Sequence, residues 1–110
     1  MVKFMVVLCR KSGSNTVEFQ RYFREVHAPL AYRMPGLKRH VVNFPADDGT
    51  RKAPLWDAIV ELYFESREAM ESAWTTPEGR EATSDLELFA DLVVSSWSLV
   101  DPIQWAPASG

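Results

Sequence analysis

The sequence predicts an α+β fold in which a four-stranded antiparallel sheet carries helices on one face. The chain has 110 residues, which suits a single domain. Its 46% hydrophobic and 25% charged residues are typical of globular proteins. Strand-like and helix-like apolar patterns alternate in the order strand, helix, strand, strand, broken helix, strand. Two βαβ units with right-handed crossovers in one sheet give a ferredoxin-like sandwich.

The first half of the chain predicts a strand, a helix and a second strand. Residues 4–9 are an apolar run before a Lys-Ser-Gly-Ser-Asn turn, which indicates a buried strand. Asn15 is then placed to cap a helix, with Glu18 at the spacing of a capping box. Pro29 predicts that this helix ends or bends near residues 27–28, and residues 37–44 read as the second strand. The apolar stripe of the helix consists of Phe19, Tyr22, Phe23, Val26 and Leu30.

The second half begins with a polar loop over residues 45–54 and a strongly alternating strand over residues 55–64. Ser66 is expected to cap a short helix, and Thr76-Pro77 to begin another. Residues 93–100 predict the last strand. The sequence therefore predicts one domain over residues 1–101 and a tail over residues 102–110 without periodicity.

Composition excludes several classes of protein. The single cysteine, Cys9, rules out an internal disulfide and a multi-cysteine zinc site. The longest apolar run has six residues against about twenty for a bilayer span, and no secretory signal is visible, so we expect a cytoplasmic protein that does not contact membranes. Asp57 and Glu61 on the third strand, and the lack of an RNA-binding aromatic run, argue against nucleic acid as a partner.

The predicted sheet leaves one face without helices. Ile59 and Tyr63 point to that face, and large apolar groups are costly to expose. A second copy of the chain would cover it most simply. We therefore expect a two-fold homodimer in which paired sheets form an α+β barrel.

His27 is the main candidate for chemistry. It follows Phe23 by four residues, so both lie on the apolar stripe of the first helix, close to where Pro29 interrupts it. An imidazole titrates near neutral pH and can transfer protons. The alternative is a structural histidine that is packed in the core or stabilised by the helix dipole.

Two motifs around this histidine resemble the EthD family of the dimeric α+β barrel superfamily. They are His-Ala-Pro-Leu-Ala at residues 27–31 and Met-Pro-Gly-Leu at residues 34–37. Residues 56–64 and 85–91 are similar to the third strand and the last helix of that family. The resemblance implies a cavity between sheet and helices in each protomer, catalysis without a metal or organic cofactor, and His27 as the family's motif histidine.

The candidate site follows from these elements. A catalytic His27 would move a proton beside a carbonyl group, and Asp85 could orient a histidine or neutralise an arginine. Two isolated histidines do not suggest a metal site. The candidates for an oxyanion donor are Tyr22, Tyr32, Arg33 and His40. The expected walls of the substrate cavity are Phe23, Leu30, Met34, Trp56, Phe89 and Trp97.

Three functions remain open at this point. Related members of the family include lactone isomerases and polyketide-modifying dehydratases or decarboxylases, so the resemblance implies a cofactor-independent isomerase or lyase. Its substrate would be a small hydrophobic, aromatic-derived or lactone/polyketide-like compound. The alternative is a non-catalytic accessory protein that binds a small ligand in a catabolic or biosynthetic pathway. A cofactor-free or haem-handling oxygenase is the third, which the motifs do not favour.

Overall fold

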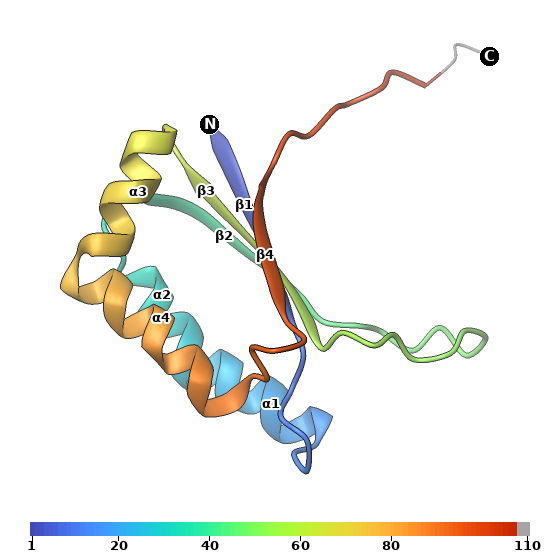
Figure 1. The fold of residues 1–110 in the computed structure, drawn as a ribbon. Coiled ribbons are helices and arrows are strands. Elements are labelled where there is room, and N and C mark those ends of the chain that lie inside the picture. The colour runs from blue at the N-terminus through green and yellow to red at the C-terminus, as the bar shows by residue number, and fades with distance from the viewer. Residues whose placement is uncertain (108–110) are drawn as a thin grey trace.

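One antiparallel sheet of four strands forms the frame of the molecule in a computed structural model that describes residues 1–107. The strands lie in the order β2-β3-β1-β4, and each neighbouring pair is antiparallel (Figure 1). This confirms the predicted ferredoxin-like arrangement. The strands are β1 (Val2–Leu8), β2 (Leu37–Asn43), β3 (Ala58–Phe64) and β4 (Ser96–Val100).

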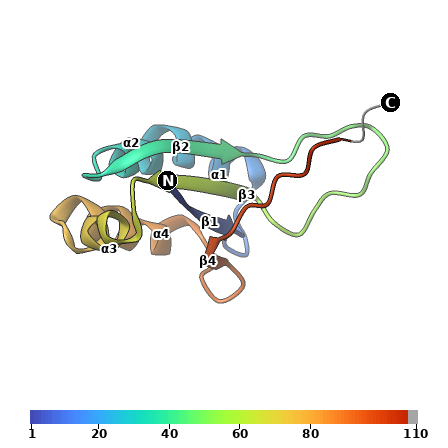
Figure 2. The ribbon, with the colours of Figure 1, turned by 90° about the horizontal axis from the view of Figure 1, so that it is seen from above.

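All helices pack on the same face of the sheet, as Figures 1 and 2 show from two directions. The opposite face carries no helix from the described part of the chain. The helical elements are α1 (Thr16–Tyr22), η1 (Phe23–His27), α2 (Ala28–Tyr32), α3 (Arg67–Thr75) and α4 (Pro77–Phe89).

The hydrophobic core lies between the sheet and the helices. In β3 every second side chain is buried, and the residues between them are only partly covered on the open face. This confirms the two faces predicted from the alternation of residues 55–64. Each large apolar side chain removed from water contributes roughly 1.5–3 kcal/mol to folding. The largest fully buried side chains are Phe23, Phe64, Leu8 and Met70.

The first helix changes its winding instead of ending at the predicted break. Between Phe23 and His27 the chain forms a π-helical segment, in which the amide of Ala28 bonds to the carbonyl of Phe23. The chain then returns to α-helix as far as Tyr32. Pro29 has no N–H to donate in the regular α-helical hydrogen-bond pattern, so a wider turn beside it gives up few hydrogen bonds. The helix thus passes through the proline with a local irregularity at His27.

The predicted helix starts are confirmed. The side chains of Asn15, Ser66 and Thr76 each accept a hydrogen bond from the amide three residues later. Each cap satisfies one of the free amides at a helix start, which stabilises the helix by about 1 kcal/mol.

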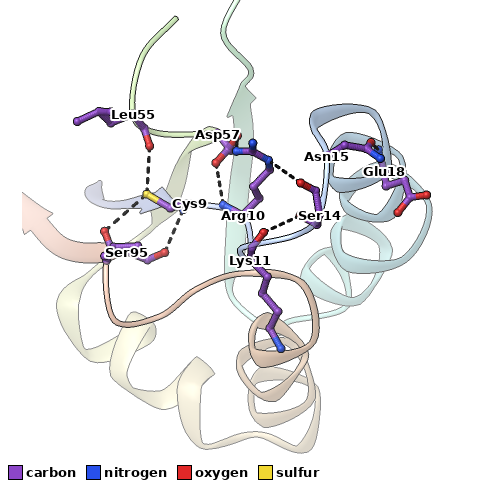
Figure 3. A network of polar contacts seen from close by, with 10 residues as sticks. Cys9, Arg10, Lys11, Ser14, Asn15, Glu18, Leu55, Asp57 and Ser95 are labelled. Carbon is purple, nitrogen blue, oxygen red and sulfur yellow. Dashed lines mark hydrogen bonds and ion pairs between the residues drawn. The ribbon is translucent and has the colours of Figure 1, made fainter.

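Strands β3 and β4 begin later than the sequence predicted, because hydrogen bonds of nearby side chains form turns just before them (Figure 3). β3 begins at Ala58 instead of residue 55, since the Asp57 carboxylate accepts the amide hydrogen of Arg10 at 2.7 Å. β4 begins at Ser96 instead of residue 93. There Asp91 organises residues 91–95, and the Ser95 hydroxyl accepts the amide hydrogen of Cys9 at 3.0 Å. The lone cysteine therefore lies just beyond β1, partly buried, and not within the strand.

Two segments project from the sheet. The connection between β2 and β3 and the chain after β4 both extend beyond the packed layers (Figures 1 and 2). In the latter, Ile103 is 70% and Trp105 83% exposed. The predicted tail over residues 102–110 has no regular structure as far as residue 107, and residues 108–110 lie outside the described residues. Across residues 1–107, every helix is too short or too polar to span a bilayer.

Gly79 tests the contact between α3 and α4. An added Cβ would overlap the backbone carbonyl of Ala73, so Gly79→Ala should destabilise the protein by about 1–3 kcal/mol. In a helix with free space around the glycine, the same change stabilises by up to about 1 kcal/mol. The sign of the change in unfolding free energy therefore shows whether the two helices pack closely at Gly79. Urea unfolding measures it, with Glu81→Ala on the exposed side of α4 as control. A Gly79→Ala protein more stable than wild type would contradict the close approach.

Candidate active site

A cavity of about 530 Å³ lies between the sheet and the helices. Strands β1 and β3 supply one wall through apolar side chains, and α2 and α4 supply the other. Only a few polar groups interrupt this surface, among them two imidazoles, His27 and His40. A cavity of this size and character suits a small hydrophobic ligand. Its apolar lining includes Phe4, Val6, Leu8, Val60, Leu62 and Leu86.

The π-helical segment presents His27 to this cavity. The residue is 7% exposed, and its ring packs against two aromatic rings that also contact each other, with centroids 5.1 Å from Phe23 and 5.0 Å from Phe89. These contacts hold the imidazole plane in place. π-Helical turns within α-helices occur frequently at functional sites.

A buried carboxylate fixes the hydrogen on His27. Asp85 of α4 is 7% exposed, and its Oδ2 lies 3.0 Å from His27 Nδ1. The hydroxyl of Tyr22 donates to its other oxygen at 2.7 Å. A carboxylate only accepts hydrogen bonds, so Nδ1 carries the hydrogen and Nε2 keeps the lone pair. The hydrogen-bond chain Tyr22–Asp85–His27 thus fixes the tautomer of the imidazole.

Two opposing effects set the proton affinity of His27. Burial lowers the pKa of the imidazole, and the hydrogen bond and negative charge of Asp85 raise it. Burial is the larger effect, so His27 is neutral at neutral pH and able to accept a proton. Burial and Asp85 raise the pKa of Tyr22 to about 12, so this phenol remains a donor.

His40 of β2 lines the same cavity, but its surroundings differ from those of His27. Burial, and secondly the nearby charge of His27, lower its pKa to about 4. Its ring stacks on Phe23 at 6.4 Å and meets the edge of Tyr32 at 5.0 Å between centroids. It has no carboxylate partner among residues 1–107, in contrast to His27.

The structure brings some of the predicted site residues together and separates others. Met34 and Trp97 line the cavity with the two histidines, whereas Phe23 and Phe89 pack against the His27 ring. The other predicted residues lie elsewhere. Leu30 is on the partly exposed side of α2, Trp56 precedes β3, and Tyr32 and Arg33 are exposed at the end of α2.

Sequence reasoning missed several lining residues. Phe4 of β1 and Trp74 of α3 lie at the cavity, with their rings 5.3 Å apart. Phe4 belonged to a predicted strand and Trp74 to a predicted short helix, but neither pattern shows where two elements leave a space. Arg80 and Glu87 add charged groups to the lining from α4. Across residues 1–107, no three His, Cys, Asp or Glu side chains gather to form a metal site.

Comparison with known proteins identifies similar chains. The sequence profile of the EthD domain matches residues 11–92. An uncharacterised 11.0 kDa protein from the thcB-thcC intergenic region of Rhodococcus erythropolis is 28% identical over 87 residues, covering 79% of this chain and 84% of that protein.

Solved structures share the fold. An EthD family protein from Bacillus halodurans superposes with a TM-score of 0.78 at 20% identity, over 94% of this chain and all of the other. SnoaB from Streptomyces nogalater, a cofactor-independent oxygenase, gives a TM-score of 0.67 at 19% identity, over 96% of both chains. A dimeric ferredoxin-like protein from Bacteroides fragilis gives 0.63 at 17% identity, over 90% and 91% of the two chains.

His40 predicts an acid-sensitive component of stability. Its pKa is 6.5 when unfolded and about 4 when folded, so the unfolded chain binds a proton first. The stability it supports is present above pH 6.5 and is lost as the pH falls towards 4. Urea unfolding at pH 7 and pH 4.5 should therefore show a smaller loss of unfolding free energy for His40→Phe than for wild type. Equal losses would contradict the neutral, partly buried state of this ring.

Proposed function

Because this chain belongs to the EthD domain family, we propose that it is a cofactor-independent isomerase or lyase that transfers a proton on a small hydrophobic compound. The substrate would be aromatic-derived or a lactone or polyketide-like molecule. The observation that carries the proposal is the buried contact between Asp85 and His27 at the wall of an apolar cavity.

The geometry supports a proton transfer in two steps. Nε2 of His27 accepts a proton from a C–H beside a carbonyl group, and the electron pair of that bond moves into an enolate. Asp85 stabilises the resulting imidazolium through Nδ1. The imidazolium then returns the proton, either to another carbon, which is isomerisation, or to a departing hydroxyl, which is elimination of water. No net oxidation occurs, so both reactions balance without a co-reactant.

The cavity supports the substrate class. Its largely apolar walls favour a flat hydrophobic molecule. Holding an enolisable C–H against a fixed base supplies much of the rate, because both reactants are already oriented. The proton transfer itself contributes about 10²- to 10⁴-fold. Ligand binding without turnover would instead indicate the accessory protein.

The open face of the sheet supports a homodimer. Met5, Val7 and Ile59 are partly covered apolar residues on this face. Its central charge is already paired, since Glu61 lies 2.9 Å from the ammonium group of Lys3. Hydrogen bonds from Lys3 and Asn43 lower the pKa of the Glu61 carboxyl to about 2.

A paired carboxylate can be covered with less desolvation cost than an isolated one. We therefore infer that a second copy of the chain packs its sheet on this face, as the dimeric state of the Bacteroides fragilis structure suggests.

The catalytic proposal predicts that the protein accelerates hydrogen exchange of an enolisable cyclic ketone. With 2-tetralone in D₂O, NMR should show faster loss of the α-protons with wild type than in buffer. His27→Gln should reduce this rate by about 10²- to 10⁴-fold. Asp85→Asn should lower the rate while leaving 2-tetralone binding similar, since the imidazolium loses its partner.

Glu71→Gln, on an exposed part of α3, is the control and should exchange like wild type. Binding of 2-tetralone with no exchange above buffer would favour the accessory protein. Exchange that survives in His27→Gln would remove His27 from the mechanism.

The dimer predicts a specific effect at Ile59. Sedimentation at micromolar concentration should give about twice the chain mass for wild type. Ile59→Lys should shift the protein towards monomer, because the ammonium would face the partner sheet without a counter-charge. Leu88→Lys, at a 67% exposed position of α4, should remain dimeric. Circular dichroism separates dissociation from unfolding, and a wild-type monomer would contradict the dimer.

A further inference from the structure

His40 holds a polar atom that folding leaves without a partner. Its Nδ1 is fully buried and has no hydrogen-bond partner among residues 1–107. The ring nevertheless lines the cavity that contains His27. Buried polar atoms are nearly always paired in folded proteins, so this unpaired nitrogen is an exception that needs an explanation.

Packing, and not hydrogen bonding, orients this imidazole. The ring lies nearly parallel to Phe23, at 25°, and the Tyr32 ring meets it at 81°. These two contacts restrict the ring without using either nitrogen. Because protein atoms cover Nδ1, Nε2 is the nitrogen of His40 that can bond to a molecule in the cavity.

The two imidazoles are electrostatically unequal. Asp85 favours a proton on His27, and a proton on His27 disfavours one on His40. No carboxylate among residues 1–107 pairs with His40, so its ring stays neutral. A neutral imidazole has one N–H and one lone pair. A buried lone pair is tolerated better than a buried N–H without an acceptor, which places the hydrogen on Nε2.

We propose that Nε2–H of His40 donates a hydrogen bond to a carbonyl oxygen of a cyclic ketone or lactone bound in the cavity. This deepens the proposed function and rests on it, since the same carbonyl acidifies the C–H that His27 attacks. The negative charge that develops on the oxygen strengthens this bond as the proton leaves. His27 moves the proton, and His40 selects and holds the carbonyl.

Two ligands that differ only in the carbonyl test the proposal. Dissociation constants of 2-tetralone and of its hydrocarbon counterpart tetralin are measured by quenching of tryptophan fluorescence. His40→Phe keeps an aromatic ring beside Phe23 and removes both nitrogens. It should weaken binding of 2-tetralone by roughly threefold to tenfold, the contribution of one hydrogen bond, and leave tetralin unchanged. His40→Gln, which retains an N–H donor, should recover part of the loss.

A second measurement excludes a purely structural role. His40→Phe should raise the melting temperature of the ligand-free protein, because it removes a buried unpaired atom, whereas loss of a structural histidine would lower it. Equal changes for both ligands, no change for either, or no binding of either to wild type would overturn the proposal. Exchange that is unaffected by His27→Gln would count against the proposed function alone, since the binding comparison does not depend on turnover.

Discussion

The site depends on the buried contact between Asp85 and His27. It joins residues 58 positions apart in the chain and connects the first helical unit to α4. A polar side chain that is 7% exposed would be destabilising without hydrogen-bond partners, and Tyr22 and His27 supply them to Asp85. The three side chains must therefore meet whenever the helices pack, so the same contact secures the fold and fixes the tautomer of His27.

The π-helical segment explains how the first helix can serve both the core and the cavity. Its wider turn accommodates an extra residue before the proline, which shifts the helix faces relative to one another. Phe23, at its start, remains in the core, while His27, at its end, reaches both Asp85 and the cavity. The motif His-Ala-Pro-Leu-Ala thus combines a buried imidazole with the proline that makes an irregular turn inexpensive.

Most of the fold was predictable because it follows from interactions between residues close in sequence. The site was less predictable because it depends on packing between elements that are distant in sequence. Helix caps such as Thr76 and the alternation of β3 follow from the residues nearby, and both were confirmed. The predicted starts of β3 and β4 were wrong. Before β3, Asp57 accepts a hydrogen bond from the backbone of Arg10, which is distant in sequence, and before β4, Asp91 closes a local turn. The sequence predicted that Asp85 could orient a histidine or neutralise an arginine, but it could not reveal which side chain the carboxylate meets. That depends on how two helices cross over the sheet.

The two imidazoles show how different surroundings give the same chemical group different properties. Both rings touch Phe23 and share one apolar cavity, so burial lowers the proton affinity of each. Asp85 offsets this effect for His27 alone. A site with two equally basic imidazoles would place a proton on either ring and would orient a carbonyl ambiguously. With one carboxylate on one side, the proposed mechanism assigns protonation and hydrogen-bond donation to different residues, and this asymmetry would set the direction in which a substrate binds.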